Sequence, residues 1–208
     1  LSAPAGPLDV YAEAALFLGP APSSIELAGD PAAGGDLGSL VRRQAHPAGT
    51  LQVSGGANYS FAWLDNRQAT VGAEYFYNQL GHDDPRVYPL LIFLNAYQPF
   101  YTGRHYASFY FTAEGADAEK HTRYTFSGLS NISDRSYIAR ADFTWRVLTY
   151  LTLGAYGDVH WGTVGGEFNF ALDTRRVSAP LTFRGAAVPA IVVQPAYFDV
   201  GLSVRMSF

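Results

Sequence analysis

Residues 197–208 at the end of the chain read YFDVGLSVRMSF and contain apolar side chains at alternate positions. Successive side chains of a β-strand point to opposite faces, so this pattern predicts a strand with one apolar and one polar face. An edge strand of a soluble β-sandwich would have such faces, and so would a transmembrane strand with a lipid face and a lumen face. The apolar positions are Phe198, Val200, Leu202, Val204, Met206 and Phe208.

The composition favours the membrane interpretation. Of the 208 residues, 48% are hydrophobic, 15% aromatic and only 15% charged, whereas about a quarter of a soluble domain is charged. No segment approaches the roughly 18 uninterrupted apolar residues of a membrane helix, which argues against a helical membrane protein. The net charge of −4 and the lack of a Lys/Arg run argue against a nucleic-acid partner.

The same alternation recurs along the chain and predicts about eight strands. Two hairpins are the clearest, one with strands at 51–63 and 69–78 and one with strands at 137–147 and 150–161. Fainter patterns occur at 8–18, 105–113 and 122–129. We therefore expect an all-β, antiparallel barrel that forms a single domain over residues 1–208.

Charged side chains fall on the polar side of these strands, and His105 is the exception. Unpaired charges are costly inside a barrel, so we expect a network of ion pairs across neighbouring strands, with Asp199 and Arg205 on the same strand face. In a wide barrel the same side chains would line water instead. The predicted network consists of Glu13, Glu74, Arg123, Arg140, Asp142, Arg146, Asp158, His160, Asp199 and Arg205.

Aromatic side chains on the apolar face lie toward the strand ends, as in the two interfacial belts of a membrane barrel. We assign Trp63 and Trp145 to one belt. The other contains Tyr75, Tyr77, Tyr137 and Trp161.

Connection lengths alternate as well. Residues 65–68, 114–121 and 148–149 form shorter turns, whereas 19–49, 79–103 and 163–193 form long loops. Outer-membrane barrels have short periplasmic turns and long external loops. The turn at 129–135 departs from this rule.

With this pattern the chain resembles the Gram-negative outer-membrane β-barrel superfamily. In that superfamily a terminal Phe, preceded by apolar residues at alternate positions, is the signal read by the barrel-assembly machinery, and the six apolar positions from Phe198 to Phe208 match it. The resemblance implies an outer-membrane location, contact with lipid and lipopolysaccharide, and the assembly machinery as a partner during biogenesis. It implies no activity.

Strand number decides between two non-catalytic functions. Eight strands leave an interior filled by side chains, whereas sixteen enclose an aqueous channel. The chain enters a strand pattern almost at its first residue, so it is either a complete small barrel or the C-terminal half of a larger one. We expect a porin-like channel component or a structural platform that binds a partner.

No catalytic residue, cofactor or metal is predicted. Outer-membrane hydrolases that act on acyl chains place Ser, His and an amide or acid on neighbouring strands, but the residue two after His105 is Ala107. A metal at Asp158, His160 and Glu167 would need three ligands in the right geometry. The alternatives that remain are such a hydrolase and a soluble β-sandwich binding module.

The segment at 83–106 is more apolar than an external loop usually is. Burial stabilises apolar side chains by about 25 cal/mol per Å², so exposing several of them to water is unfavourable in free energy. We expect this loop to plug its own barrel or to contact a partner protein. Its apolar residues include Leu90, Leu91, Ile92, Phe93, Leu94, Phe100 and Tyr101.

Overall fold

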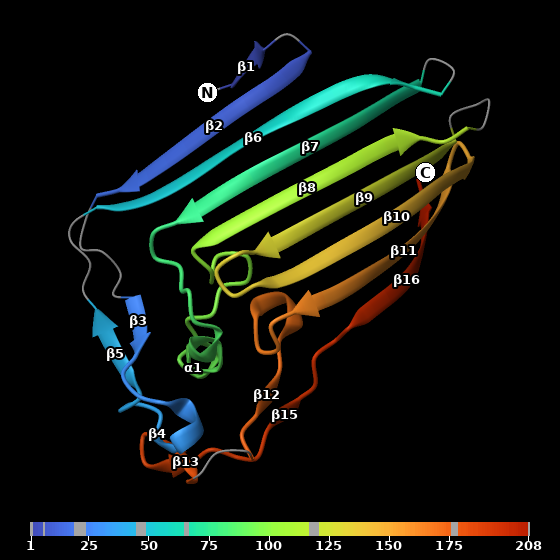
Figure 1. The fold of residues 1–208 in the computed structure, drawn as a ribbon. Coiled ribbons are helices and arrows are strands. Elements are labelled where there is room, and N and C mark those ends of the chain that lie inside the picture. Colours follow the sequence, from blue (N-terminus) through green and yellow to red (C-terminus); the bar gives the residue numbers. More distant parts are fainter. Residues whose placement is uncertain are drawn as a thin grey trace.

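A computed structural model describes residues 2–5, 7–18, 24–44, 49–64, 67–116, 121–175 and 179–207. One antiparallel sheet dominates the molecule (Figure 1), with the strand order β1-β2-β6-β7-β8-β9-β10-β11-β16. The long strands have 9 to 14 residues. They are β2 (Leu8–Phe17), β6 (Thr50–Trp63), β7 (Arg67–Asn78), β8 (His105–Glu114), β9 (Thr122–Asn131), β10 (Ser136–Leu148), β11 (Leu151–Gly162) and β16 (Phe198–Met206).

The expected all-β class and the antiparallel arrangement are confirmed. Every long strand coincides with a segment predicted from the alternation, although β9 extends two residues further, to Asn131. The additional short strand β1 (Ser2–Ala5) pairs with the start of β2.

The register keeps like faces together across the sheet. On β11, Val159 lies opposite Ala139 of β10 and Phe198 of β16, all three apolar. The next residue on β11, Asp158, lies opposite Arg140 and Asp199. Because side chains alternate along each strand, this register makes one face of the whole sheet apolar and the other polar.

One end of the sheet, which we call the short-turn end, is where β6 leads to β7, β8 to β9, and β10 to β11 through short connections. The short link 132–135 between β9 and β10 lies at the opposite end. The turn between β10 and β11 falls one residue later than predicted, because a register shift between Arg146 and Leu148 lets β10 continue to Leu148.

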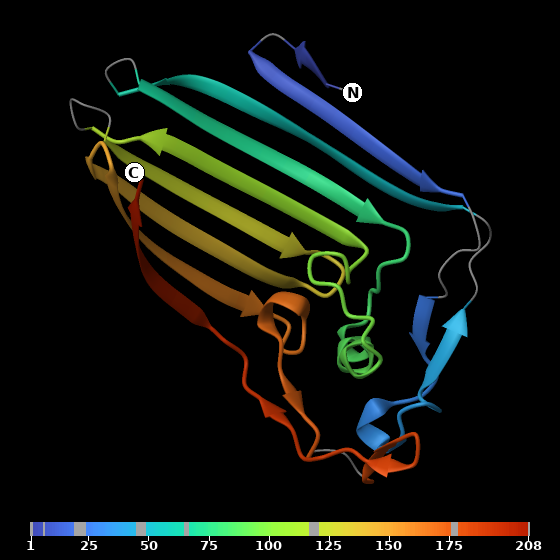
Figure 2. The same cartoon turned by 180° about the vertical axis from the view of Figure 1, so that it is seen from behind.

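The long connections contain short elements and gather at the opposite end, the loop end (Figures 1 and 2). After β2 come β3 (Ser24–Leu27), η1 (Pro31–Ala33), β4 (Gly35–Asp36) and β5 (Val41–Gln44). After β7 come η2 (Pro85–Val87) and α1 (Tyr88–Phe93). After β11 come η3 (Glu167–Asn169), β12 (Leu172–Asp173), β13 (Leu181–Phe183), β14 (Ala186–Ala187) and β15 (Val192–Val193).

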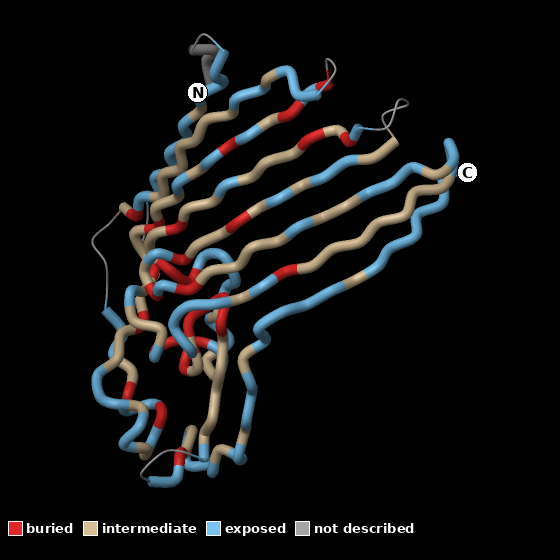
Figure 3. Tube along the Cα trace, turned by 45° about the vertical axis from the view of Figure 1, so that its right-hand side comes forward, coloured by how far each residue is buried: buried red, intermediate tan, exposed pale blue. Residues whose placement is uncertain are grey.

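The buried apolar clusters lie among these connections rather than on the large sheet (Figure 3). One contains Ile25, Val87, Tyr88 and Leu91, and the other contains Leu37, Leu40, Leu90 and Leu181. Each joins segments that are far apart in the sequence. In the described part of the chain, no second sheet packs on the apolar face of the long strands.

The large sheet is curved and open. Within the described residues β16 pairs only with β11 and β1 pairs only with β2, so the two edges do not meet. No helix in the described segments is long and apolar enough to cross a membrane.

Candidate functional site: the polar face of the sheet

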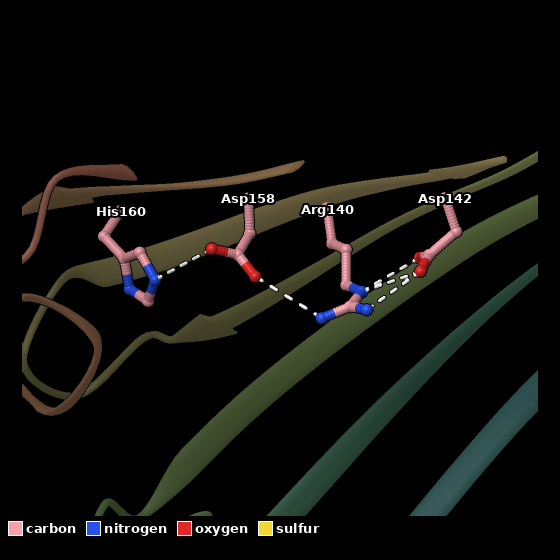
Figure 4. Close-up of polar contacts among 4 residues, drawn as sticks. All are labelled: Arg140, Asp142, Asp158 and His160. Atoms are coloured by element: carbon pink, nitrogen blue, oxygen red, sulfur yellow. Dashed lines mark hydrogen bonds and ion pairs between the residues drawn. The ribbon is translucent and has the colours of Figure 1, made fainter. Parts of the chain in front are cut away.

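The central feature of the polar face is an ion-pair chain on β10 and β11 (Figure 4). Arg140 Nε donates to both carboxylate oxygens of Asp142 at 3.0 Å, and its Nη1 lies 3.4 Å from Asp158 Oδ2. His160 Nε2 is 3.5 Å from Asp158 Oδ1. Residues two apart on one strand share a face, which explains how these four side chains meet.

The ring of Tyr156 lies against Arg140, a member of this ion-pair chain. The guanidinium of Arg140 lies 3.9 Å from the ring centroid of Tyr156, in cation–π geometry. The Tyr156 ring in turn occupies the space above Gly201 on β16, where any Cβ atom would overlap it. The glycine on β16 therefore leaves room for the Tyr156 ring, so that β16 can lie beside the cluster formed by β10 and β11.

The rest of the predicted charge network does not form as expected. Asp199 lies opposite Asp158, whereas Arg205 lies opposite Thr152. Asp199 and Arg205 share a strand face but are six residues apart, or roughly 20 Å along the strand, so they do not contact each other. Among the described residues, Arg123, Arg146 and Arg205 make no ion pair of the kind that Arg140 makes.

A pocket of about 350 Å³ lies on the polar face near the loop end. Glu13 and Glu74 line it together with aromatic side chains, and Tyr11 donates to Glu74 Oε2 at 2.6 Å. Phe100 and Tyr101 reach this pocket from the long connection after β7. The predicted acids Glu13 and Glu74 thus belong to this pocket and not to the Arg140 cluster.

A buried polar cluster joins the loop end to the sheet. Asn131 Nδ2 donates to Asp134 Oδ2 at 3.0 Å and to Glu167 Oε2 at 2.9 Å. Tyr88 donates to Asp134, and Tyr106 donates to Glu167. Burial raises the pKa of Glu167 and that of Tyr88, because their charged forms lose water.

Of this cluster, only Glu167 was considered from the sequence. Its residues come from β8, β9, α1 and two connections, and no local spacing relates them. Tyr88 in the apolar segment after β7 and Asn131 at the end of β9 were the available signal.

The three residues considered as metal ligands do not assemble. Glu167 belongs to the buried cluster, while His160 Nδ1 contacts the carbonyl oxygen of Phe168 at 2.7 Å. Within the described part of the chain, no group of three or more His, Cys, Asp or Glu residues is placed to hold a metal ion.

Aromatic side chains on the apolar face gather toward its two ends. Trp63 packs edge-on against Phe111 at 5.8 Å and belongs to the short-turn end, as Trp145 does. Tyr137 stacks on Trp161 at 5.6 Å toward the loop end. The imidazole of His105 lies on this face between Tyr75, whose hydroxyl is 2.6 Å from Nδ1, and the ring of Tyr77.

The apolar loop segment is only partly buried. Leu90 and Leu91 are 2% and 3% exposed, and their neighbours Phe93 and Leu94 pack against the same clusters. These contacts come from the other long connections of the same chain. Ile92, Phe100 and Tyr101 stay exposed, and the latter two overhang the polar face.

The residues of the expected assembly signal lie on the free edge of the sheet. Five of them, Phe198, Val200, Leu202, Val204 and Met206, are in β16 and are between 58% and 88% exposed. Phe208 lies outside the described residues.

No protein-family model, curated protein or solved structure matches this chain.

Proposed function

We propose that this protein is a non-catalytic component of a Gram-negative outer-membrane β-barrel, and that its polar face lines a path for hydrophilic solutes. The observation that carries the proposal is the uncovered apolar face, which continues across all the long strands. Leu202 is 88% exposed, and Phe198 and Val200 are 73% and 71% exposed. Apolar surface of this extent is unfavourable in water and calls for lipid or a partner surface.

The spacing of the aromatic residues supports lipid as the contact. On β10, Tyr137 and Trp145 are separated by eight residues, or about 26 Å along the strand at roughly 3.3 Å per residue. With the usual tilt of about 40°, this corresponds to roughly 20 Å along the membrane normal, which is close to the apolar band of about 25 Å in membrane barrels. Alanine occupies the outward positions 139 and 141 between them, and the aromatic ends would lie at the headgroups.

The open edges favour a barrel wider than eight strands. In lipid, an unpaired backbone N–H or C=O group is costly, so a membrane sheet must close. Because the edge formed by β1 and β2 does not meet β16 within the described residues, further strands would pair with these two edges. A wider barrel would leave water over the polar face, which would explain why Arg146 and Arg205 have no acidic partner among the described residues.

The other interpretations have less support. A soluble β-sandwich needs a second sheet over the apolar face, and the described residues supply none. A hydrolase would need a nucleophile beside His105, whose imidazole instead contacts Tyr75 and Tyr77.

The test uses two neighbouring positions on β16. Leu202→Arg places a charge on the apolar face, whereas Ser203→Arg places the same charge on the polar face. An arginine near the bilayer midplane costs about 2–4 kcal/mol on the lipid face, so we expect Leu202→Arg to reduce folding into lipid vesicles strongly and Ser203→Arg to fold like the wild type. Equal folding of both variants, or a monodisperse wild-type monomer without detergent, would contradict the proposal.

A further inference from the structure

Three arginines converge at the short-turn end of the polar face. Arg146 and Arg205 lie opposite the same residue, Thr152, from the two sides of β11. Two strand spacings separate their backbones by about 10 Å. Arg123 lies on β9, on the other side of β10, opposite Thr144.

The surface between these arginines is hollowed. One hollow of about 440 Å³ is lined by Arg123, Arg146, Thr144 and Thr152, together with Glu114 and His121. A second hollow of about 560 Å³ is lined by Thr144, Thr152, Ser203 and Arg205 among others. The two hollows share Thr144 and Thr152, so they adjoin each other, and we refer to them together as the depression.

Among the described residues that line this depression, the charges are unbalanced. Three guanidinium groups face one carboxylate, that of Glu114, which lies opposite Arg123 and itself takes part in an interaction. Elsewhere on the same face Arg140 is matched by Asp142 and Asp158. Like charges repel, and an anion held between these groups would remove that repulsion.

The chemistry of the lining matches an oxyanion. Guanidinium groups bind phosphate oxygens through paired N–H donors, and the hydroxyl groups of Thr144, Thr152 and Ser203 add further donors. We propose that Arg123, Arg146 and Arg205 form a binding site for a small soluble phosphate-type oxyanion. This inference goes beyond the proposed function, because binding can be measured without conduction.

The experiment titrates inorganic phosphate into the full chain, folded in a zwitterionic detergent at low ionic strength. Saturable heat or a saturable ³¹P shift is expected, and the double variant Arg146→Gln/Arg205→Gln should weaken binding at least tenfold. Arg43→Gln, which removes an exposed arginine of β5 at the loop end, is the matched control and should bind like the wild type. Absence of saturation, or equal binding by the double variant, would overturn the site.

A conservative variant and a lipid comparison test two alternative explanations. Arg205→Lys keeps the charge but loses the paired donors, so it should bind several-fold more weakly even if the double variant fails to fold. In nanodiscs, phosphate affinity should be the same with and without phosphatidylglycerol. A lower affinity with that lipid would assign the site to a lipid headgroup and overturn the soluble anion. Folding and heat-dependent migration report on the membrane proposal separately.

Discussion

At the scale of single residues, Arg140 is the side chain whose partners are best defined. It neutralises Asp142 and the mostly buried Asp158, and it covers Tyr156. Arg140→Gln leaves Asp158 with His160 alone. Because Arg140 itself is 40% exposed, we expect a loss of only about 1 kcal/mol in the free energy of unfolding.

Urea unfolding of the detergent-folded protein measures this loss. The control is Arg205→Gln, which removes an arginine without an acidic partner in the described residues and should leave stability unchanged. Arg140→Gln/Asp158→Asn should recover part of the loss, since it removes the unmatched carboxylate as well. Equal destabilisation by Arg140→Gln and Arg205→Gln would contradict the expectation that Arg140 stabilises the sheet through its acidic partners.

Glu167 predicts a pH dependence of the loop end. Its pKa is raised in the folded protein, so the stabilising contribution is fully present below the ordinary Glu pKa of about 4.3 and is lost as the pH rises through the raised value. Asp134, Tyr88 and Tyr106 face it in the same cluster. Hydrogen-exchange protection of residues 85–94, corrected for intrinsic rates, should therefore decline with rising pH.

Glu167→Gln should flatten that decline, because the amide does not ionise. The exposed Glu26, which pairs with Arg42 at the surface, provides the control Glu26→Gln with a wild-type profile. A Glu167→Gln profile that matches the wild type would show that another group titrates.

The sequence predicts the face of each polar residue but not its partner. Alternation alone places Arg140 and Asp158 on one face, and the tight hairpin brings them into register. The partners of Asp199 and Arg205 depend on where β16 docks along β11, a relation between segments separated by a long connection. The buried cluster of Asp134 and Glu167 depends on several such relations and has no local sequence signal.

At the scale of elements, the short helix α1 holds the long connections together. Leu91 is buried against Ile25 and Val87, while the adjacent Ile92 is 43% exposed. Leu91→Ser should loosen the loop end by about 2–5 kcal/mol, as expected when a buried leucine is truncated. Ile92→Ser on the same helix should have little effect.

Limited proteolysis at the loop end measures the difference. Cleavage in the segment from Pro85 to Phe93 should accelerate for Leu91→Ser and stay at the wild-type rate for Ile92→Ser, while the strands remain protected in both variants. Similar cleavage of both variants would show that α1 does not hold the connections.

Strands were more predictable than connections for a physical reason. A strand shows its faces in its own sequence with a period of two, whereas the short elements β3, β5 and β13 have only three or four residues. Such elements are stabilised by apolar contacts with other connections, so their own sequences contain little signal. The sequence of the apolar segment after β7 indicated that this segment must be buried. It did not indicate that the other long connections bury it.

At the scale of the whole molecule, the two edges of the large sheet define the next test. The chain contains no cysteine, so introduced pairs can be cross-linked without background. Leu202→Cys with Ala155→Cys joins adjacent strands in known register and should cross-link efficiently. Leu202→Cys combined in turn with Ala12→Cys or Ala14→Cys, which lie on the part of β2 beyond its pairing with β1, should not cross-link within one chain.

Efficient cross-linking between β2 and β16 would mean that the eight strands close on themselves. The polar face would then enclose a narrow interior, and the wider barrel would be excluded. The strand count alone could not settle this point from sequence, because the same alternation suits an edge and an interior strand.

The interlocked loop end also has a consequence for the order of folding. Leu181 packs with Leu37, Leu40 and Leu90, residues that are made much earlier during synthesis. Contacts between such distant positions require the closure of long chain segments, which slows their formation. The first two long connections therefore complete their packing only after the third has been made. A chain interrupted before residue 181 would leave exposed those apolar side chains that are buried in the finished protein.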